Sequence, residues 1–532
     1  MLQRNPRTFE NSRDHRCGEP REPANQYRTL HTRGLRHSLR RSTRQDDHRA
    51  PRPSGMTDPA PASAIAPALR RALTVGLVLA EALGAIEMVV VAAIMPAVVT
   101  DIGGLEFYAW TFSAYMLATV VSIPIAGRAA DRSGPAWPFT LGMAAYVAGL
   151  VAAAASPTML WLTAARALQG IGAGVIYAIA MGTIAKAYPE SRRARILALL
   201  SFAWIVPGMV GPALGAFIAT HFGWRWAFIA PIPMVPVVVV LALPALRRLR
   251  PAADVPEALS PIYPVLLGIG SAVFIAGLNG KWWIAIATSI AGIAVAYPGF
   301  KKILPAGSIA ARAGLPAAVA AAFMLEFGLF GADSFVPLML TEVRGRSLTE
   351  AGIAVTAVSV GWAAGSWTQA RITDRYSHRR LATAGSLLVA ICIALTASAM
   401  AGAPLALAYV SWGIGGVGMG ITFSTIMLVA MEQASPGAEA TATSAAGLSG
   451  TLGGAIGPGL GGAGVTLAHA LDAPISRGLA WAFGISIAAS LAVALIAGRL
   501  PTVRRDSSPD QEAAESDTLL RRDVATDVSA GN

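Results

Sequence analysis

Charged residues are scarce in this chain. Asp, Glu, Lys and Arg make up 14% of its 532 residues, whereas hydrophobic residues make up 54%. A soluble domain of ordinary composition is about one quarter charged, and a soluble chain of this length would form several domains, each with a charged surface. The composition therefore excludes a cytosolic enzyme, a disordered chain and a disulfide-rich scaffold. It predicts a protein that crosses a membrane many times.

Cysteine and the signatures of common enzymes are also missing. The two cysteines, Cys17 and Cys392, lie in a basic segment and in an apolar run, so we expect neither a disulfide nor a metal-ligand cluster. Beyond residue 55 the histidines are His221, His378 and His469. The sequence contains no GxSxG, HExxH, GxxxxGKS or GxxxxGKT pattern. We therefore predict neither an enzyme nor a directly ATP-driven pump, and no cofactor or bound metal.

The N-terminal segment, 1–68, lacks any apolar run. Residues 1–55 hold 13 arginines against six acidic residues, which accounts for +7 of the chain's net charge of +12. Without the apolar core of a signal peptide, the segment 1–68 is predicted to be a disordered basic tail. Two interpretations stay open: the tail binds nucleic acid or anionic lipid, or Met56 is the true start. We favour the second and expect no nucleic-acid partner.

Apolar runs long enough to cross a bilayer recur from about residue 70. A span needs roughly 20 residues, and we expect fourteen spans. They lie at about 73–97, 107–126, 138–156, 158–185, 194–218, 226–246, 262–279, 282–299, 313–341, 349–369, 380–401, 404–431, 440–466 and 477–498. Only Asn279-Gly280-Lys281 divides the central pair, so 262–299 is either a tight helical hairpin or one interrupted segment.

Lysine and arginine are unevenly divided between the expected loops. With the N-terminus inside, the cytoplasmic loops carry sixteen of these residues and the outer loops carry five. This bias predicts cytoplasmic N- and C-termini. The expected organisation is then an N-terminal six-helix bundle over 69–250, a central two-helix insertion over 251–312, a C-terminal six-helix bundle over 313–499 and a disordered cytoplasmic tail over 500–532.

Two sequence patterns occur twice at almost the same separation. Gly127-x-x-x-Asp131-Arg132-x-Gly134 follows the second span, and Asp374-Arg375 follows the tenth, at an offset of 243 in the numbering. The fifth span contains Gly208-x-x-Gly211-Pro212-x-x-Gly215, and the thirteenth contains Gly453-x-x-x-Gly457-Pro458-x-x-Gly461, at an offset of 246 between the prolines. A common offset for unrelated patterns indicates two six-span halves related by duplication, a construction that is common in transporters.

These motifs resemble those of the major facilitator superfamily. The loop after the second span, the glycine-proline run in the fifth and Arg166-x-x-Gln169-Gly170 in the fourth fit that family. Fourteen spans, with Trp224-Arg225-Trp226 opening the sixth, resemble its fourteen-span drug:proton antiporter branch. Over about 70–500, the resemblance implies an all-α membrane protein of two six-helix bundles with two extra central spans, working as a monomer in the cell membrane by alternating access.

The chain departs from the branch at three places. Pro135-Ala136-Trp137 stands where the first loop signature normally ends in a basic run. Met88, Val89 and Ala92 replace polar residues of the first-span pattern, and Ala230-Pro231-Ile232-Pro233 replaces an Asn-Val-Pro pattern in the sixth span. These differences leave the substrate and the details of coupling open.

Ionisable residues inside the apolar spans are the candidate proton-coupling and substrate residues, because burying such a group in a bilayer costs several kcal/mol. They are Glu87, Asp333, Glu326 and Arg166, with Glu81 as a further acid within the first span. Asp333 follows Glu87 at the offset of the repeat, so each half offers one acid at a similar depth; the alternative is that Asp333 already lies at the wet outer end of its span. Glu326 lies two helical turns before Asp333, on the same helical face, where two acids could share protons or bind a cation.

Two interpretations stay open for Glu87 and Arg166. A carboxyl group shielded from water binds a proton readily, so Glu87 could exchange a proton for a cationic substrate in each cycle. Alternatively, it is permanently paired. Arg166 resembles the family's fourth-span arginine, which is associated with proton transfer, or it is a structural counter-ion for Glu87 or Glu81.

The repeated motifs supply two further sets of candidates. The resemblance implies a cytoplasmic gating loop formed by Gly127, Asp131, Arg132 and Gly134, with its repeat at Asp374 and Arg375. The alternative is a loop that serves only to orient the chain. The second set, in which close helix packing either marks an antiporter or is structural only, consists of Gly208, Gly211, Pro212, Gly215, Gly453, Gly457, Pro458 and Gly461.

The function that we expect is secondary active transport: export of amphipathic or cationic small molecules, driven by a proton gradient. Its partners would be the lipid bilayer, protons and a small-molecule substrate. The alternative is a dedicated exporter or importer of one metabolite, lipid or siderophore in the same superfamily.

Overall fold

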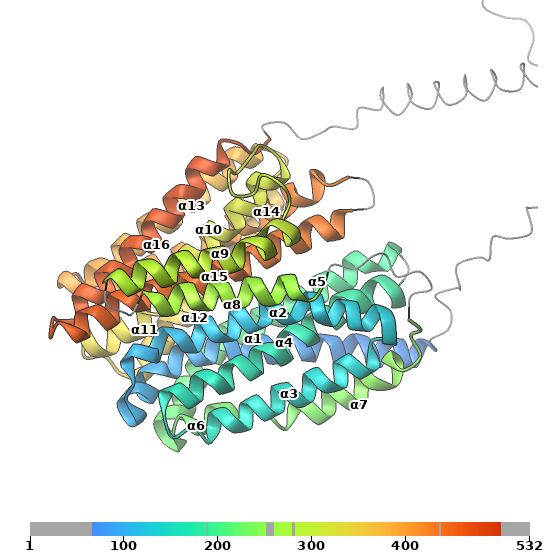
Figure 1. Cartoon of the computed structure of the whole chain (residues 1–532), viewed down its shortest axis with the longest axis horizontal. Coiled ribbons are helices and arrows are strands. Elements are labelled where there is room, and N and C mark those ends of the chain that lie inside the picture. The colour runs from blue at the N-terminus through green and yellow to red at the C-terminus, as the bar shows by residue number, and fades with distance from the viewer. Residues whose placement is uncertain (1–65, 189, 252–259, 279–281, 436–437, 502–532) are drawn as a thin grey trace, which may run out of the picture. The chain divides into compact units, whose positions relative to one another are not determined.

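The computed structural model describes residues 66–501, apart from 189, 252–259, 279–281 and 436–437 (Figure 1). Every regular element in this part of the chain is a helix. Helices satisfy all backbone hydrogen bonds within one segment, which apolar surroundings require. The predicted tails at 1–68 and 500–532 and the divider at 279–281 lie largely or wholly outside the described residues.

The first bundle contains the helices before residue 250. They are α1 (Pro67–Ile102), a 3-10 turn η2 (Leu105–Phe107), α2 (Tyr108–Ser133), α3 (Ala136–Ala154), α4 (Met159–Ala187), α5 (Glu190–Phe222), α6 (Arg225–Ile229) and α7 (Met234–Leu246). Within this bundle α4 packs against α2 and α3, while α1 packs against α5 and α7. Pro231 and Pro233 separate α6 from α7, because proline cannot donate the backbone hydrogen bond of a helix.

The second bundle repeats this arrangement. It contains α10 (Leu315–Asp333), α11 (Val336–Leu338), a π-helix η3 (Met339–Val343), α12 (Leu348–Ile372), α13 (His378–Ala397), a 3-10 turn η4 (Ser398–Ala401), α14 (Leu405–Glu432), α15 (Glu439–Ala470) and α16 (Ile475–Ala497). Here α14 packs against α12 and α13, and α10 packs against α15 and α16.

Glycine contacts show the repeat at atomic detail. Gly172 of α4 lies against the backbone of Gly142 in α3, and Gly418 of α14 lies against Gly385 in α13. The two pairs are separated by the offsets of the repeated motifs. Small residues let membrane helices approach closely, so the same packing recurs in both bundles. The domain boundaries expected from the sequence remain predictions.

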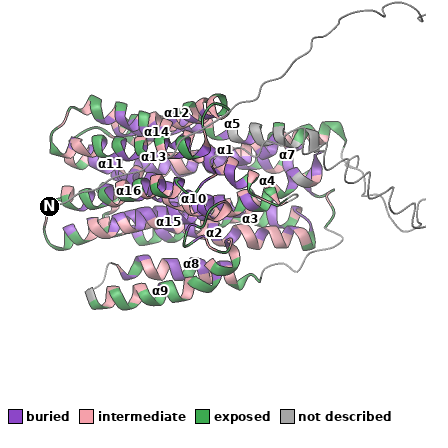
Figure 2. Cartoon of the chain, turned by 90° about the horizontal axis from the view of Figure 1, so that it is seen from above, coloured by how far each residue is buried: buried purple, intermediate pink, exposed green. Residues whose placement is uncertain are grey.

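The central helices lie beside the line where the bundles meet. They are α8 (Ile262–Gly277) and α9 (Trp282–Ile303), which form a closely packed pair. Figure 2 shows the pair at the edge of the bundles, next to α2 and α15. Gly268 of α8 contacts Val121 of α2, and Ile275 contacts Gly459 of α15. The α8 helix therefore touches both bundles.

Twelve helices of the described residues are long and apolar enough to cross a membrane. Each coincides with one of the fourteen predicted spans, which confirms a many-span helical membrane protein. The other two predicted spans are helices that fall outside the twelve. One is α8, which has 16 residues, and the other is α15, which is rich in glycine, serine and threonine. The count of fourteen and the cytoplasmic termini remain predictions.

Candidate functional site

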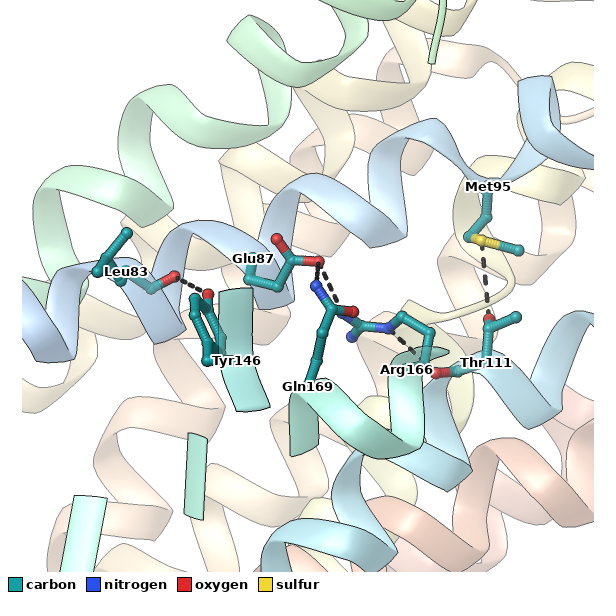
Figure 3. A network of polar contacts seen from close by, with 7 residues as sticks. All are labelled: Leu83, Glu87, Met95, Thr111, Tyr146, Arg166 and Gln169. Atoms are coloured by element: carbon teal, nitrogen blue, oxygen red, sulfur yellow. Dashed lines mark hydrogen bonds and ion pairs between the residues drawn. The ribbon is translucent and has the colours of Figure 1, made fainter. Parts of the chain in front are cut away.

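Glu87 and Arg166 form an ion pair in the interior of the first bundle (Figure 3). Arg166 Nη1 lies 2.7 Å from Glu87 Oε1, and the side chains are 2% and 1% exposed. The same carboxylate oxygen accepts a hydrogen bond from Gln169 Nε2 at 3.1 Å. Both donors come from α4, three residues apart and on one face of the helix. The carboxylate of α1 therefore has a full counter-charge and a second donor.

The guanidinium of Arg166 is held on several sides. Its Nη1 donates to Gln169 Oε1 at 2.9 Å, and its Nε donates to the backbone oxygen of Thr111 in α2 at 3.3 Å. The group also lies over the Tyr115 ring, 4.3 Å from the centroid. A buried guanidinium needs such partners because it remains protonated. Arg166 is thus the counter-ion of Glu87, an arrangement compatible with both interpretations of the pair.

Asp333 ends α10 at the corresponding place in the second bundle. Its Oδ1 accepts a hydrogen bond from Trp412 Nε1 of α14 at 3.2 Å. Trp412 is fully buried. One residue after Asp333, the backbone oxygen of Ser334 accepts a hydrogen bond from the Tyr108 hydroxyl at 2.8 Å. Since Tyr108 belongs to α2, Asp333 lies next to a contact between the two bundles.

Glu326 and Glu81 are buried acids without a cationic partner among the described residues. Glu326 is 8% exposed and its carboxylate lies against Gly450 of α15. Glu81 is 5% exposed; Trp204 of α5 donates to its Oε2 at 3.3 Å, while its Oε1 has no hydrogen-bond partner. Tyr177 of α4 interacts electrostatically with both acids. Tyr177 and Trp204 are themselves 41% and 42% exposed.

Glu326 and Asp333 do not form the facing pair that the sequence suggested. Glu326 contacts α15, whereas Asp333 binds α14. Two turns of helix separate them by about 10 Å along the axis. The two carboxyl groups therefore cannot share one proton directly, although both remain candidate sites.

The expected gating loop makes a contact within the first bundle. Lys186 Nζ at the end of α4 lies 2.8 Å from Asp131 Oδ1 at the end of α2. Gly134 ends α2 with φ of 82°, a conformation that glycine adopts without strain. Gly127 of α2 has open space at its Cβ position, and Arg132 is exposed. The latch between bundles thus remains a prediction, as does its repeat at the exposed Asp374 and Arg375.

The glycine-proline runs lie at close contacts between helices. Gly208 of α5 contacts Ser359 of α12 across the bundles, and the backbone oxygen of Pro212 contacts Gly352 of the same helix. Two further residues of the run, Gly211 and Gly215, contact Val89 and Val90 of α1. In the second run, Gly453 and Gly457 contact the backbone of Phe323 and Phe327 in α10, and Gly461 contacts the Phe335 ring. Pro458 lies within α15, between these contacts.

Some polar contacts were not expected from the sequence. One of them is the hydrogen bond that Trp412 donates to Asp333. Trp412 follows Arg166 at the offset of the repeat, a signal that could have indicated this contact. Arg225 and Trp224, which belong to the branch motif that opens the sixth span, both donate to Asp101 at the end of α1. Nothing in the sequence pattern links these two residues to Asp101.

Comparison with known proteins gives consistent matches. A model of the Major Facilitator Superfamily matches residues 77–458 and, in a second match, 318–528. The multidrug transporter protein MdtP of Bacillus subtilis (strain 168) is 24% identical over 384 residues, 70% of this chain and 71% of that protein. A probable multidrug-efflux transporter of Mycobacterium tuberculosis (strain H37Rv) is 28% identical over 434 residues, 75% of this chain and 88% of that protein.

A solved structure has the same fold. The crystal structure of a D-xylose-proton symporter superposes with a TM-score of 0.60 at 14% sequence identity, covering 82% of this chain and 98% of the symporter chain. Similarity at this level of identity concerns the fold alone, so the sugar and the direction of transport of that protein carry no information about this one.

Proposed function

Because this chain belongs to the Major Facilitator Superfamily, we propose that it is a proton-coupled exporter of amphipathic or cationic small molecules. The family and the twelve apolar helices make the chain a multi-pass transporter of the cell membrane and not an enzyme. The substrate class, the driving ion and the direction of transport are the parts that we propose.

The observation that carries the proposal is the set of buried acids along the two bundles. Glu81 and Glu326 have no cationic partner in the described part of the chain, and polar aromatic side chains lie near them. A carboxyl group in such surroundings is favourable only when it holds a proton or a cation. Exchange of one for the other is the chemical basis of proton–cation antiport. The names of the multidrug relatives favour drug efflux over nutrient uptake.

The bundle contacts favour alternating access. Ser113 of α2 donates to the backbone oxygen of Ala455 in α15 at 2.6 Å, close to the Tyr108–Ser334 hydrogen bond. These bonds lie toward the end of the molecule that carries Asp101. With both termini in the cytoplasm this is the outer end, so the bundles meet outside. Rocking them apart there would release substrate outward. The six-plus-two-plus-six organisation and the gating loop belong to the same proposal.

The proposal is tested with inside-out vesicles from cells that make residues 56–532. We expect a fluorescent lipophilic cation to accumulate when a proton gradient is present, and accumulation to collapse on adding an uncoupler. Vesicles lacking the protein are the control. If correctly inserted, folded protein gives no accumulation, multidrug export is wrong, and a dedicated exporter becomes the alternative, as the substitutions Met88, Val89 and Ala92 in the first span would suggest.

A further inference from the structure

The buried Glu87–Arg166 contact and the partly buried Asp333–Trp412 contact occupy equivalent places in the duplicated bundles. Asp333 follows Glu87 at the offset of the repeat, and Trp412 follows Arg166 at the same offset. In each bundle the acid is on the first long helix, α1 or α10, and the donor is on the fourth long helix, α4 or α14. The chain therefore carries two copies of one contact, and comparing them shows what has changed.

The second copy has lost its positive charge. In the first bundle a guanidinium lies 2.7 Å from the carboxylate, whereas in the second a neutral indole N–H lies 3.2 Å away. The second donor is also lost, because position 415, the counterpart of Gln169, is a glycine. Asp333 thus has one neutral donor where Glu87 has a counter-charge and an amide.

The groups around Asp333 do not replace that charge. The Tyr108 hydroxyl of α2 lies close enough to feel the charge of Asp333, and the other charge that acts on this hydroxyl, Glu342 of η3, is also negative. Gly457 of α15 and Ser486 of α16 lie against Gly331, which precedes Asp333 in α10. No lysine, arginine or histidine among the described residues forms a salt bridge with Asp333.

This difference separates two roles. Protonating Glu87 means breaking a buried ion pair, and breaking such a pair costs several kcal/mol. At Asp333 no ion pair has to be broken, and the neutral indole can donate to the carboxyl group in either protonation state. A proton can therefore come and go at Asp333 without disrupting the packing of its bundle.

We propose that Asp333 is the group that binds and releases the transported proton, that the Glu87–Arg166 pair stays ionised as a fixed part of the first bundle, and that Trp412 is a positioning residue. The assignment rests on the proposed proton-coupled function. The neighbouring Tyr108–Ser334 hydrogen bond joins the bundles, so a change of charge at Asp333 takes place beside the contact that must open. This connects proton binding to movement.

Infrared difference spectroscopy on the purified full chain tests the assignment without substrate. A protonated carboxyl group has a carbonyl stretch that disappears on ionisation. We expect a band of this kind that decreases as pH rises, is lost in Asp333→Asn and persists in the double variant Glu87→Gln/Arg166→Gln. If the spectral difference between wild type and Asp333→Asn is absent, or does not change with pH, the assignment is wrong.

Variants of Trp412 test its positioning role. Trp412→Phe keeps a ring but removes the N–H, so the Asp333 band should remain and shift in frequency. Trp412→Arg supplies the charge present in the first bundle, so the band should vanish while gradient-driven transport is lost and substrate exchange without a gradient continues. A band that is unchanged in both variants would contradict the positioning role of Trp412. If Trp412→Arg loses substrate exchange as well as gradient-driven transport, that variant is structurally damaged, and Asp333→Asn decides the assignment.

The two proposals can fail separately. A pH-dependent Asp333 band in protein that drives no dye transport would refute drug export and leave the proton site standing. Gradient-driven transport that survives in Asp333→Asn would refute the proton site and leave proton-coupled export standing.

Discussion

At the scale of single residues, burial sets how much stability is lost when one partner of an ion pair is removed. Glu87→Gln leaves Arg166 buried without a counter-ion, and arginine cannot discharge itself by losing its proton. We expect this variant to lose about 3–5 kcal/mol of stability. Arg166→Gln should cost less because Glu87 can take up a proton, and the double variant Glu87→Gln/Arg166→Gln should recover much of the loss. Thermal unfolding of the purified proteins in detergent measures the order of stability of these three variants.

The exposed pair between Arg225 and Asp101 is the matched control. Its side chains are 43% and 51% exposed, and water and salt screen such pairs. Arg225→Gln should therefore unfold close to the wild-type temperature. Equal losses in Arg225→Gln and Glu87→Gln would show that burial does not set the strength of these pairs.

The sequence indicates which residues are ionisable within spans but not which of them meet. Glu87, Arg166, Glu326 and Asp333 were all identified from charge in apolar runs. Their pairing depends on how each helix is rotated about its axis, which tertiary packing fixes. Only the repeat offset carries such information: once Glu87 is known to bind Arg166, the spacing predicts that Asp333 meets Trp412.

At the scale of helices, glycine sets how closely neighbours approach. Gly170 of α4 lies against the backbone carbonyl of Tyr115, and its repeat Gly416 of α14 lies against that of Val358. A Cβ at either place would overlap backbone that cannot turn away. We expect Gly170→Ala and Gly416→Ala each to lose about 1–3 kcal/mol of stability, measured by thermal unfolding.

Gly182 provides a control on the same helix, α4, since nothing lies within 4 Å of its Cβ position. Gly182→Ala should be neutral or stabilise by up to about 1 kcal/mol, because alanine favours helix. Destabilisation by Gly182→Ala equal to that by Gly170→Ala would show that helix contact is not the cause.

Helix positions were more predictable than helix interruptions. Every predicted span coincides with a helix or an interrupted helix, because the length of an apolar run can be counted from the sequence. The break between α6 and α7 at 230–233, and the end of α10 before Ser334, were not predicted. Two prolines mark the first break, and Pro337, which has no N–H to bond the carbonyl four residues earlier, follows the second. At this second break the Tyr108 hydroxyl donates to the freed backbone oxygen of Ser334.

At the scale of the molecule, the duplication could be predicted from the sequence, whereas the position of the central helices α8 and α9 could not. The common offset of the repeated motifs predicted two related bundles, and equivalent contacts recur at that offset. The position of α8 against Val121 of α2 and Gly459 of α15 depends on surface shape that no local pattern records. In that position α8 covers one side of the contact between α2 and α15.

Transport by rocking bundles requires the outer contact to open, and a disulfide tests this. The Cβ position of Gly352 in α12 lies 3.1 Å from Ala216 Cβ and 2.8 Å from the backbone oxygen of Pro212, both in α5. A small outward shift of α12 relieves the second contact and brings the Cβ atoms to the roughly 3.5–4.5 Å of a disulfide. With Cys17 and Cys392 replaced by alanine, Gly352→Cys/Ala216→Cys should form a cross-link on oxidation. Vesicle transport should then stop and return on reduction.

A disulfide within one bundle is the control for the oxidation treatment itself, because it cannot lock the two bundles together. The Cβ position of Gly142 in α3 lies 2.8 Å from Val175 Cβ in α4, closer than the roughly 3.5–4.5 Å of a disulfide. Gly142→Cys/Val175→Cys should therefore cross-link once α3 and α4 move slightly apart. Because both helices move together when the bundles rock, this variant should transport equally well oxidised and reduced. Full transport by the oxidised Gly352→Cys/Ala216→Cys protein would mean that α5 and α12 stay together throughout the cycle, and the proposed opening between them would be wrong.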